Sequence, residues 1–172
     1  MAKRISLREF QETLVARLTS AARGEAARAL LGVESGHDLW LLDLFDSGEV
    51  VPLPTLTGVP LTKPWFAGIA NIRGTLYSVV DFSAFLGGET TPHNSDARLL
   101  LVGAKHGSNC ALLVKRTLGL RTLGALELTP DGAAADGAPW RGERYRDGQQ
   151  KSWTRLRVKQ LLTDPSFLDI GL

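Results

Sequence analysis

The spacing of apolar residues along the chain changes near residue 37. Before that point, five apolar residues recur at steps of three and four: Leu7, Phe10, Leu14, Leu18 and Ala21. This is the period of an amphipathic helix. Beyond it, apolar residues come in short runs separated by turn residues, which is typical of strands. The pattern predicts a helical extension over residues 1–36 and a mostly β domain over residues 37–172.

The start of the N-terminal helix is well defined by the sequence. Ser6 and Glu9 fit a capping box, in which each side chain bonds a backbone N–H freed at the helix start. Gly24 is a plausible end of the helix, and residues 25–31 could continue as a second short helix. The apolar stripe must pack against something. Its own domain is one candidate, and a partner helix is the other.

Two similar rounds of apolar runs and turns follow. The runs are Leu39–Phe45, Val50–Leu53, Thr75–Val80, Arg98–Val102, Cys110–Val114 and Leu118–Leu123. Short, evenly spaced strands of this kind favour small closed barrels, which leave few strand edges unpaired. We expect a first barrel at about 37–88, a second at about 97–155, and a C-terminal helix and tail over 156–172.

Particular residues punctuate these runs. Asp81 can cap a short helical turn over residues 82–86, which Gly87 ends. Asp147 and Gly148 predict a tight hairpin turn. Pro165 is expected to stop the last helix. The prolines between residues 52 and 64 indicate an extended connection outside any central strand.

Composition excludes several classes of protein. The 172 residues carry a net charge of +2 and one cysteine, Cys110, so an intrachain disulfide is excluded. No apolar run is long enough to span a bilayer, and the charged N-terminus does not fit a signal peptide. We expect a cytoplasmic protein without direct membrane insertion. Residues 37–98 are acidic overall and residues 99–172 are basic, which either favours docking with complementary partners or reflects ordinary solvated surface.

The sequence gives little support for catalysis. Cys110 opens an apolar run, where a buried small hydrophobe is expected. His37, His93 and His106 fall in turns or linkers and match no zinc spacing. Asp43 and Asp81 lie in apolar surroundings, but a strand face and a helix cap explain them. Since there is also no glycine-rich phosphate loop, we expect no enzyme activity, no cofactor and no metal.

A nucleic-acid-binding barrel is the alternative from another class. It requires basic side chains interleaved with exposed aromatic ones. Only residues 140–146, from Trp140 to Arg146, have that composition. Glu143 dilutes the charge, and Trp140 could equally pack inside a hairpin. We therefore expect no nucleic-acid partner.

Residues 64–87 contain the most informative motif. Gly68 permits a bulge or a close backbone approach. Asn71-Ile72-Arg73-Gly74 is a tight turn between two strands, and it places Arg73 on a rigid base. An arginine held in this way is a good recognition group for carboxylates and carbonyls. From local physics alone, a plain surface arginine is an equally good interpretation.

This window resembles the signature of CheW-like domains, the coupling proteins of bacterial chemotaxis. The shared pattern is a glycine, Asn-x-Arg-Gly, a strand, and an aspartate before a short helical turn. The resemblance is strong between Trp65 and Gly87, fair over residues 98–123 and weak elsewhere. It implies a pair of five-stranded SH3-like barrels with peripheral helices.

Within the family, the resemblance is greatest to the PilI type, the adaptor of type IV pilus chemosensory systems. The helical extension, the wording around Arg73 and the tail after Phe167 suggest this type. The resemblance implies a non-enzymatic adaptor between the cytoplasmic tip of methyl-accepting chemoreceptors and the regulatory domain of a CheA-like histidine kinase. The partner-binding residues it implies are Gly68, Asn71, Ile72, Arg73, Gly74 and Asp81.

The chain departs from the family pattern at three positions. Ser78 stands where proline is frequent, and Phe82 replaces the leucine after the aspartate. Lys115 follows Val114 where the family commonly has an aspartate, which reverses a charge. Either the partner of this chain has an altered charge, or the position does not contribute to docking.

Overall fold

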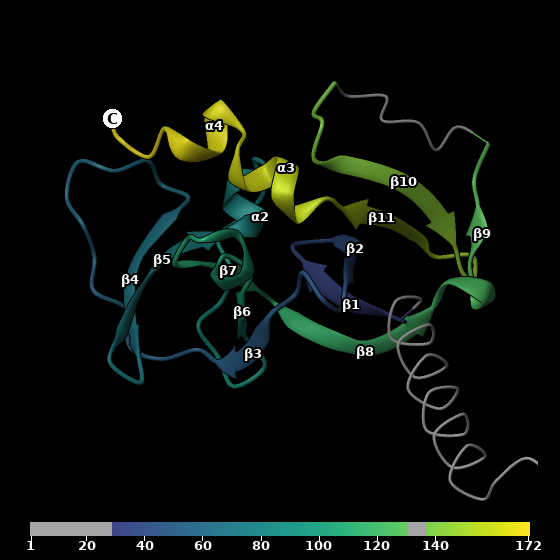
Figure 1. Cartoon of the computed structure of the whole chain (residues 1–172), viewed down its shortest axis with the longest axis horizontal. Coiled ribbons are helices and arrows are strands. Elements are labelled where there is room, and N and C mark those ends of the chain that lie inside the picture. The colour runs from purple at the N-terminus through teal and green to yellow at the C-terminus, as the bar shows by residue number, and fades with distance from the viewer. Residues whose placement is uncertain (1–28, 131–136) are drawn as a thin grey trace, which may run out of the picture.

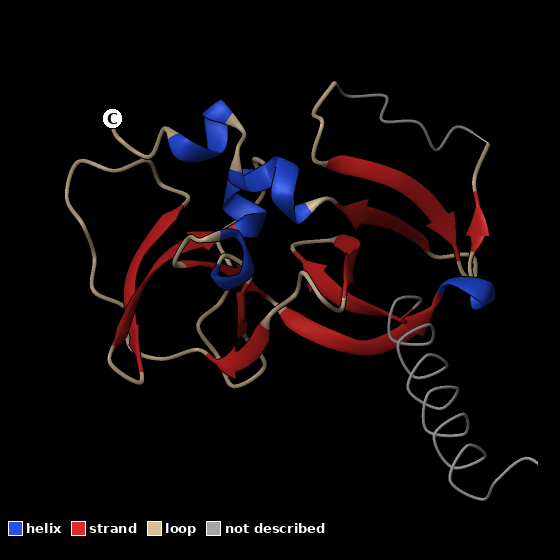
Figure 2. Ribbon diagram, in the orientation of Figure 1, coloured by secondary structure: helices blue, strands red, loops and turns tan. Residues whose placement is uncertain are grey.

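The structure, a computed structural model, describes residues 29–130 and 137–172 (Figure 1). The helix predicted from Ser6 to Gly24 lies outside these residues. Within the described chain, strands form two sheets and the helices are short (Figure 2). The prediction of a mostly β protein is confirmed.

The first sheet has six strands in the order β8-β1-β2-β11-β10-β9, with only the β11–β2 pair parallel. The strands are β1 (Ala29–Ser35), β2 (Asp38–Asp43), β8 (Arg116–Thr122), β9 (Glu127–Leu128), β10 (Arg141–Arg146) and β11 (Ser152–Leu156). Residues 123–126, which include the 3-10 turn η2 (Leu123–Ala125), are all that separates β8 from β9. Because β8 and β9 are opposite edges, this short link shows that the sheet curls into a barrel.

The second sheet has five strands in the order β3-β6-β7-β5-β4, with β5 and β7 parallel. The strands are β3 (Glu49–Pro52), β4 (Phe66–Ile72), β5 (Thr75–Asp81), β6 (Arg98–Leu101) and β7 (Cys110–Val114). A 3-10 turn, η1 (Ala104–His106), lies between β6 and β7. The proline-rich connection from β3 to β4 is extended, as predicted, and covers part of the β4 edge. Thr57 and Ile69 exchange backbone hydrogen bonds there, at 2.9 and 2.8 Å.

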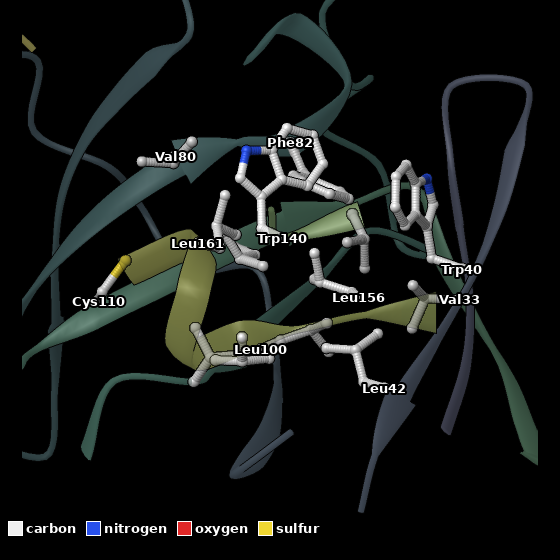
Figure 3. Close-up of a cluster of buried hydrophobic side chains, with 14 of the residues drawn as sticks. Val33, Trp40, Leu42, Val80, Phe82, Leu100, Cys110, Trp140, Leu156 and Leu161 are labelled. Carbon is white, nitrogen blue, oxygen red and sulfur yellow. The ribbon is translucent and has the colours of Figure 1, made fainter. Parts of the chain in front are cut away.

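Each sheet encloses its own apolar core, and a third core joins the two sheets. Successive strand residues point to opposite faces, so Leu30 and Leu41 fill the six-stranded barrel while Leu31 and Leu42 face the other sheet. In the same way, Leu99 points into the five-stranded barrel. The joint core is the largest (Figure 3). Because these strands are buried on both faces, the two SH3-like subdomains pack as one unit.

Three short helices complete the joint core: α2 (Phe82–Phe85), α3 (Val158–Leu162) and α4 (Pro165–Leu168). The ring of Phe82 meets that of Trp40 edge-on, with centroids 5.0 Å apart. Phe167 of α4 likewise meets Phe85, at 5.2 Å. Aromatic side chains from helices distant in sequence therefore fill the junction between the barrels.

Two boundaries differ from the sequence prediction. Residues 29–31, expected in a second short helix, begin β1, because Leu30 and Leu31 are buried on opposite faces of the sheet and a doubly buried strand reads as a continuous apolar run. The barrels also do not follow the predicted segments 37–88 and 97–155. Strand β2 belongs to the six-stranded sheet, whereas β6 and β7 belong to the five-stranded one. Local patterns mark strands but not their pairing partners.

Two turn predictions are correct in position but not in detail. Asp147 does begin the β10–β11 hairpin, but the turn extends over residues 147–151, with the Asp147 carboxylate accepting the N–H groups of Gln149 and Lys151 at 2.9 Å each. Pro165 does not only stop α3. It is the first residue of α4, where its missing N–H costs nothing.

Candidate functional site

The Asn71–Gly74 turn lies at the tip of the β4–β5 hairpin. Arg73 and Gly74 form its two central residues, with φ values of 52° and 85°. Two successive positive φ values define the turn that best matches the twist of a hairpin. The Asn71 Oδ1 accepts the N–H of Gly74 at 2.9 Å and closes the turn. The local sequence thus fixes the backbone under Arg73.

The Arg73 side chain is the most prominent group of this turn. It is 69% exposed and forms an ion pair with Glu49, the first residue of β3. Ile72, directly before it, is half-buried against the core of the five-stranded barrel. An exposed charged fork on an anchored hairpin can bind a carboxylate without paying to order its own backbone.

Gly68 lies beneath this surface and not on it. It is buried at a β-bulge with a φ of 127°. A Cβ at this position would lie 2.4 Å from the carbonyl oxygen of Thr57. The glycine therefore allows the β3–β4 connection to pair with β4, as the expected close backbone approach required.

Asp81 is also internal, with 3% of its surface exposed. Its carboxylate caps α2 by accepting the N–H of Ala84 at 3.3 Å. It also accepts the backbone N–H of Thr91 at 2.7 Å and the Thr91 hydroxyl at 2.8 Å. The predicted cap is confirmed, and the burial leaves Asp81 to position its neighbours rather than touch a partner.

The structure therefore divides the six residues singled out in the sequence. Asn71, Arg73 and Gly74 are exposed together at the hairpin tip, whereas Gly68 and Asp81 support the barrel from within. Sequence reasoning missed Glu49, because nothing local to residue 49 indicates that it reaches a turn 24 residues away.

Exposed apolar side chains occur near the Arg73–Glu49 pair, and they too were missed. Phe45 is 55% exposed in the turn before β3, and Val50 on β3 is 37% exposed. Leu76, which pairs with Asn71 across the hairpin, is 59% exposed. An apolar surface around a charged group is typical of protein interfaces. The weak signal in the sequence was an apolar residue at a strand position adjoining a turn.

Lys115, the position of reversed charge, has a partner within the chain. Its ammonium lies 2.6 Å from Glu34, and the Arg116 guanidinium lies 2.5 Å from the same carboxylate. Partial burial alone would raise the pKa of Glu34, but these two hydrogen-bonded cations outweigh it and hold that pKa below its usual value. The charge reversal is thus accommodated by Glu34 on β1.

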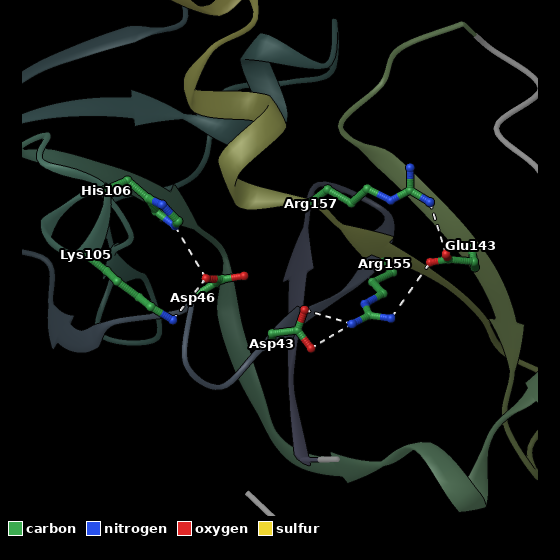
Figure 4. Close-up of polar contacts among 7 residues, drawn as sticks. All are labelled: Asp43, Asp46, Lys105, His106, Glu143, Arg155 and Arg157. Atoms are coloured by element: carbon green, nitrogen blue, oxygen red, sulfur yellow. Dashed lines mark hydrogen bonds and ion pairs between the residues drawn. The ribbon is translucent and has the colours of Figure 1, made fainter. Parts of the chain in front are cut away.

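The candidate acids and histidines are engaged in structural contacts (Figure 4). Asp43 accepts two hydrogen bonds from Arg155 at 2.9 Å each, which links β2 to β11. His106 is half-buried, with its Nε2 3.4 Å from Asp46, so the expectation of a fully solvated loop histidine is wrong for this residue. His37 and His93 are exposed, as expected.

Cys110 is buried in the joint core, as predicted. Burial raises the pKa of its thiol to about 12, so the reactive thiolate is scarce at neutral pH. In residues 29–130 and 137–172, no three His, Cys, Asp or Glu side chains gather in a way that could hold a metal ion. Within the same ranges, no helix is both long and apolar enough to cross a membrane.

The aromatic residues of the basic window do not form a stacking surface. Trp140 and Tyr145 are 6% and 7% exposed, and Trp153 across the hairpin is 1% exposed. Bases that stack on a single-stranded-nucleic-acid binder require exposed rings. This arrangement weighs against the nucleic-acid alternative.

Two packed SH3-like barrels with an exposed arginine turn define a β-barrel interaction module. The chain belongs to the family of CheW-like domains, whose model matches residues 29–166. That range begins at the first residue of β1 and spans both barrels.

Two known proteins illustrate the relationship. The chain is 35% identical over 72 residues to protein PilI of Pseudomonas aeruginosa strain PAO1, a match that covers 42% of this chain and 40% of PilI. The alignment thus spans less than half of that relative. The crystal structure of the scaffolding protein TtCheW from Thermoanaerobacter tengcongensis has the same fold, with a TM-score of 0.62 and 22% identity. It covers 76% of this chain and 89% of TtCheW.

Proposed function

We propose that this chain is a non-enzymatic cytoplasmic adaptor that couples methyl-accepting chemoreceptors to a CheA-like histidine kinase. The observation that carries the proposal is the family match over residues 29–166, which includes both barrels and the Arg73 turn. The likeness to PilI supports a role in a type IV pilus system that controls twitching motility.

The geometry suggests how such an adaptor makes contact. The Arg73 turn supplies a charged anchor that touches the receptor tip or the regulatory domain of the kinase. Phe45, Val50 and Leu76 supply apolar area beside it. Gly68 and Asp81 hold the barrel beneath the turn in shape, so that binding requires little rearrangement.

Reconstitution from purified parts tests this function. The full chain is mixed with a receptor cytoplasmic-tip fragment and the kinase from the same organism, and complexes are measured by analytical ultracentrifugation. We expect binary complexes with each partner, a ternary complex, and kinase autophosphorylation that responds to the receptor only when the chain is present. Failure to bind either partner would contradict the proposal.

Oligonucleotide binding tests the alternative function. Nucleic-acid binders lose affinity steeply with salt, because each phosphate contact releases counterions. We expect no binding of mixed-sequence oligonucleotides at physiological salt, measured by fluorescence anisotropy, despite a pI near 8.9. Tight binding that weakens linearly on a log–log salt plot would favour the nucleic-acid barrel.

A further inference from the structure

The Glu49 carboxylate engages the guanidinium of Arg73 in the free chain. We propose that Glu49 occupies the place that an acidic side chain of the partner takes on binding, so that the partner displaces Glu49 from Arg73. The inference rests on the proposed function, in which the Arg73 turn is the contact. It adds the chemistry of the partner and an internal competitor for the site.

The two residues come from opposite edges of one barrel. Glu49 starts β3 and Arg73 follows β4, and these strands are the two edges of the five-stranded sheet. Glu49 is held in place by its neighbours. Gly48 has a φ of 55°, and its Cα packs so closely on β6 that a Cβ would lie 2.0 Å from the Leu101 carbonyl oxygen. Both backbones are therefore fixed, while the side chains between them are free to exchange partners.

The ion pair is of the kind that a partner can displace. The side chains of Arg73 and Glu49 are 69% and 51% exposed. Across the part of the chain that the structure describes, neither has a second ion-pair partner. Exposed pairs of this kind contribute little to stability, so opening this one costs little. The planar fork of arginine then offers a carboxylate two parallel hydrogen bonds.

The surroundings indicate what the incoming surface must look like. Phe45, Val50 and Leu76 are exposed on the elements that carry the ion pair. A partner that covers them removes water from Arg73, and a desolvated guanidinium without an acceptor is costly. The partner surface is therefore apolar with an acidic side chain among its contacts.

Binding of Glu49→Gln tests the inference. This variant removes the competing charge but keeps the size of the side chain. We expect it to bind the partner fragment about threefold more tightly than the wild type, in line with the small energy of an exposed pair. In the Arg73→Ala background the same change should give no gain. Dissociation constants from isothermal titration calorimetry provide the readout.

A matched control is available in the same subdomain. Asp169→Asn removes one charge from another exposed ion pair, Lys63–Asp169 at 2.7 Å, and should leave the affinity unchanged. Unchanged binding of Glu49→Gln would overturn the competition, and weaker binding would show that Glu49 itself contacts the partner. If the wild-type chain binds neither fragment, the proposed function fails. If it binds, and Arg73→Ala weakens binding while Glu49→Gln does not tighten it, only this inference fails.

Discussion

Replacing Asp81 by alanine should lower the free energy of unfolding by about 3 kcal/mol. The substitution removes the cap of α2, which is typically worth about 1 kcal/mol. It also leaves the Thr91 N–H and hydroxyl buried without their acceptor, and a stranded polar group costs roughly 1–3 kcal/mol. Urea unfolding followed by tryptophan fluorescence measures the loss.

An exposed aspartate of the same subdomain provides the control. Asp96→Ala changes charge and size equally, but its side chain is exposed, so stability should change by less than about 0.5 kcal/mol. If Asp81→Ala were as stable as Asp96→Ala, the buried carboxylate would not hold the 81–91 loop as described.

Gly68→Ala should be comparably destabilising, by about 3 kcal/mol. A φ of 127° is costly for any residue with a Cβ. The added carbon would also lie 2.4 Å from the Thr57 carbonyl oxygen, so the β3–β4 connection must move away from β4. Such overpacking alone costs roughly 1–3 kcal/mol. Thermal and urea unfolding of the purified variant give the measurement.

Gly58→Ala is the matched control, one residue beyond Thr57. Its φ lies outside the left-handed region, and a Cβ there meets no atom within 4 Å. We expect a change within about 0.5 kcal/mol. Equal stability of the two variants would show that the approach of Thr57 to Gly68 does not constrain the barrel.

The parts of the site that depend on local backbone were predictable from the sequence. Asn71 to Gly74 form a turn whose conformation is determined by the residues within it, and Asp81 caps the helix that follows it directly. Turn and cap chemistry acts over three or four residues and is therefore visible in a short window.

The remaining features depend on residues distant in sequence. Glu49 meets Arg73 only because the edges of the five-stranded sheet come together. Strand β1 pairs with β2 on one side and with β8, about 85 residues later, on the other. Alternation of apolar residues identifies a strand but says nothing about which strand lies beside it. The exchange of strands between the two barrels was hidden for the same reason.

The affinity of Arg73→Ala for the receptor-tip and kinase regulatory-domain fragments tests the account most directly. The substitution removes an exposed anchor but no buried volume, so the melting temperature should match that of the wild type. Binding to at least one fragment should weaken by about thirtyfold, or roughly 2 kcal/mol. Arg146→Ala, the same change at an exposed position of β10, should bind like the wild type. Unaltered affinity of Arg73→Ala for both fragments would contradict the account, because the turn would then lie outside the contact surface.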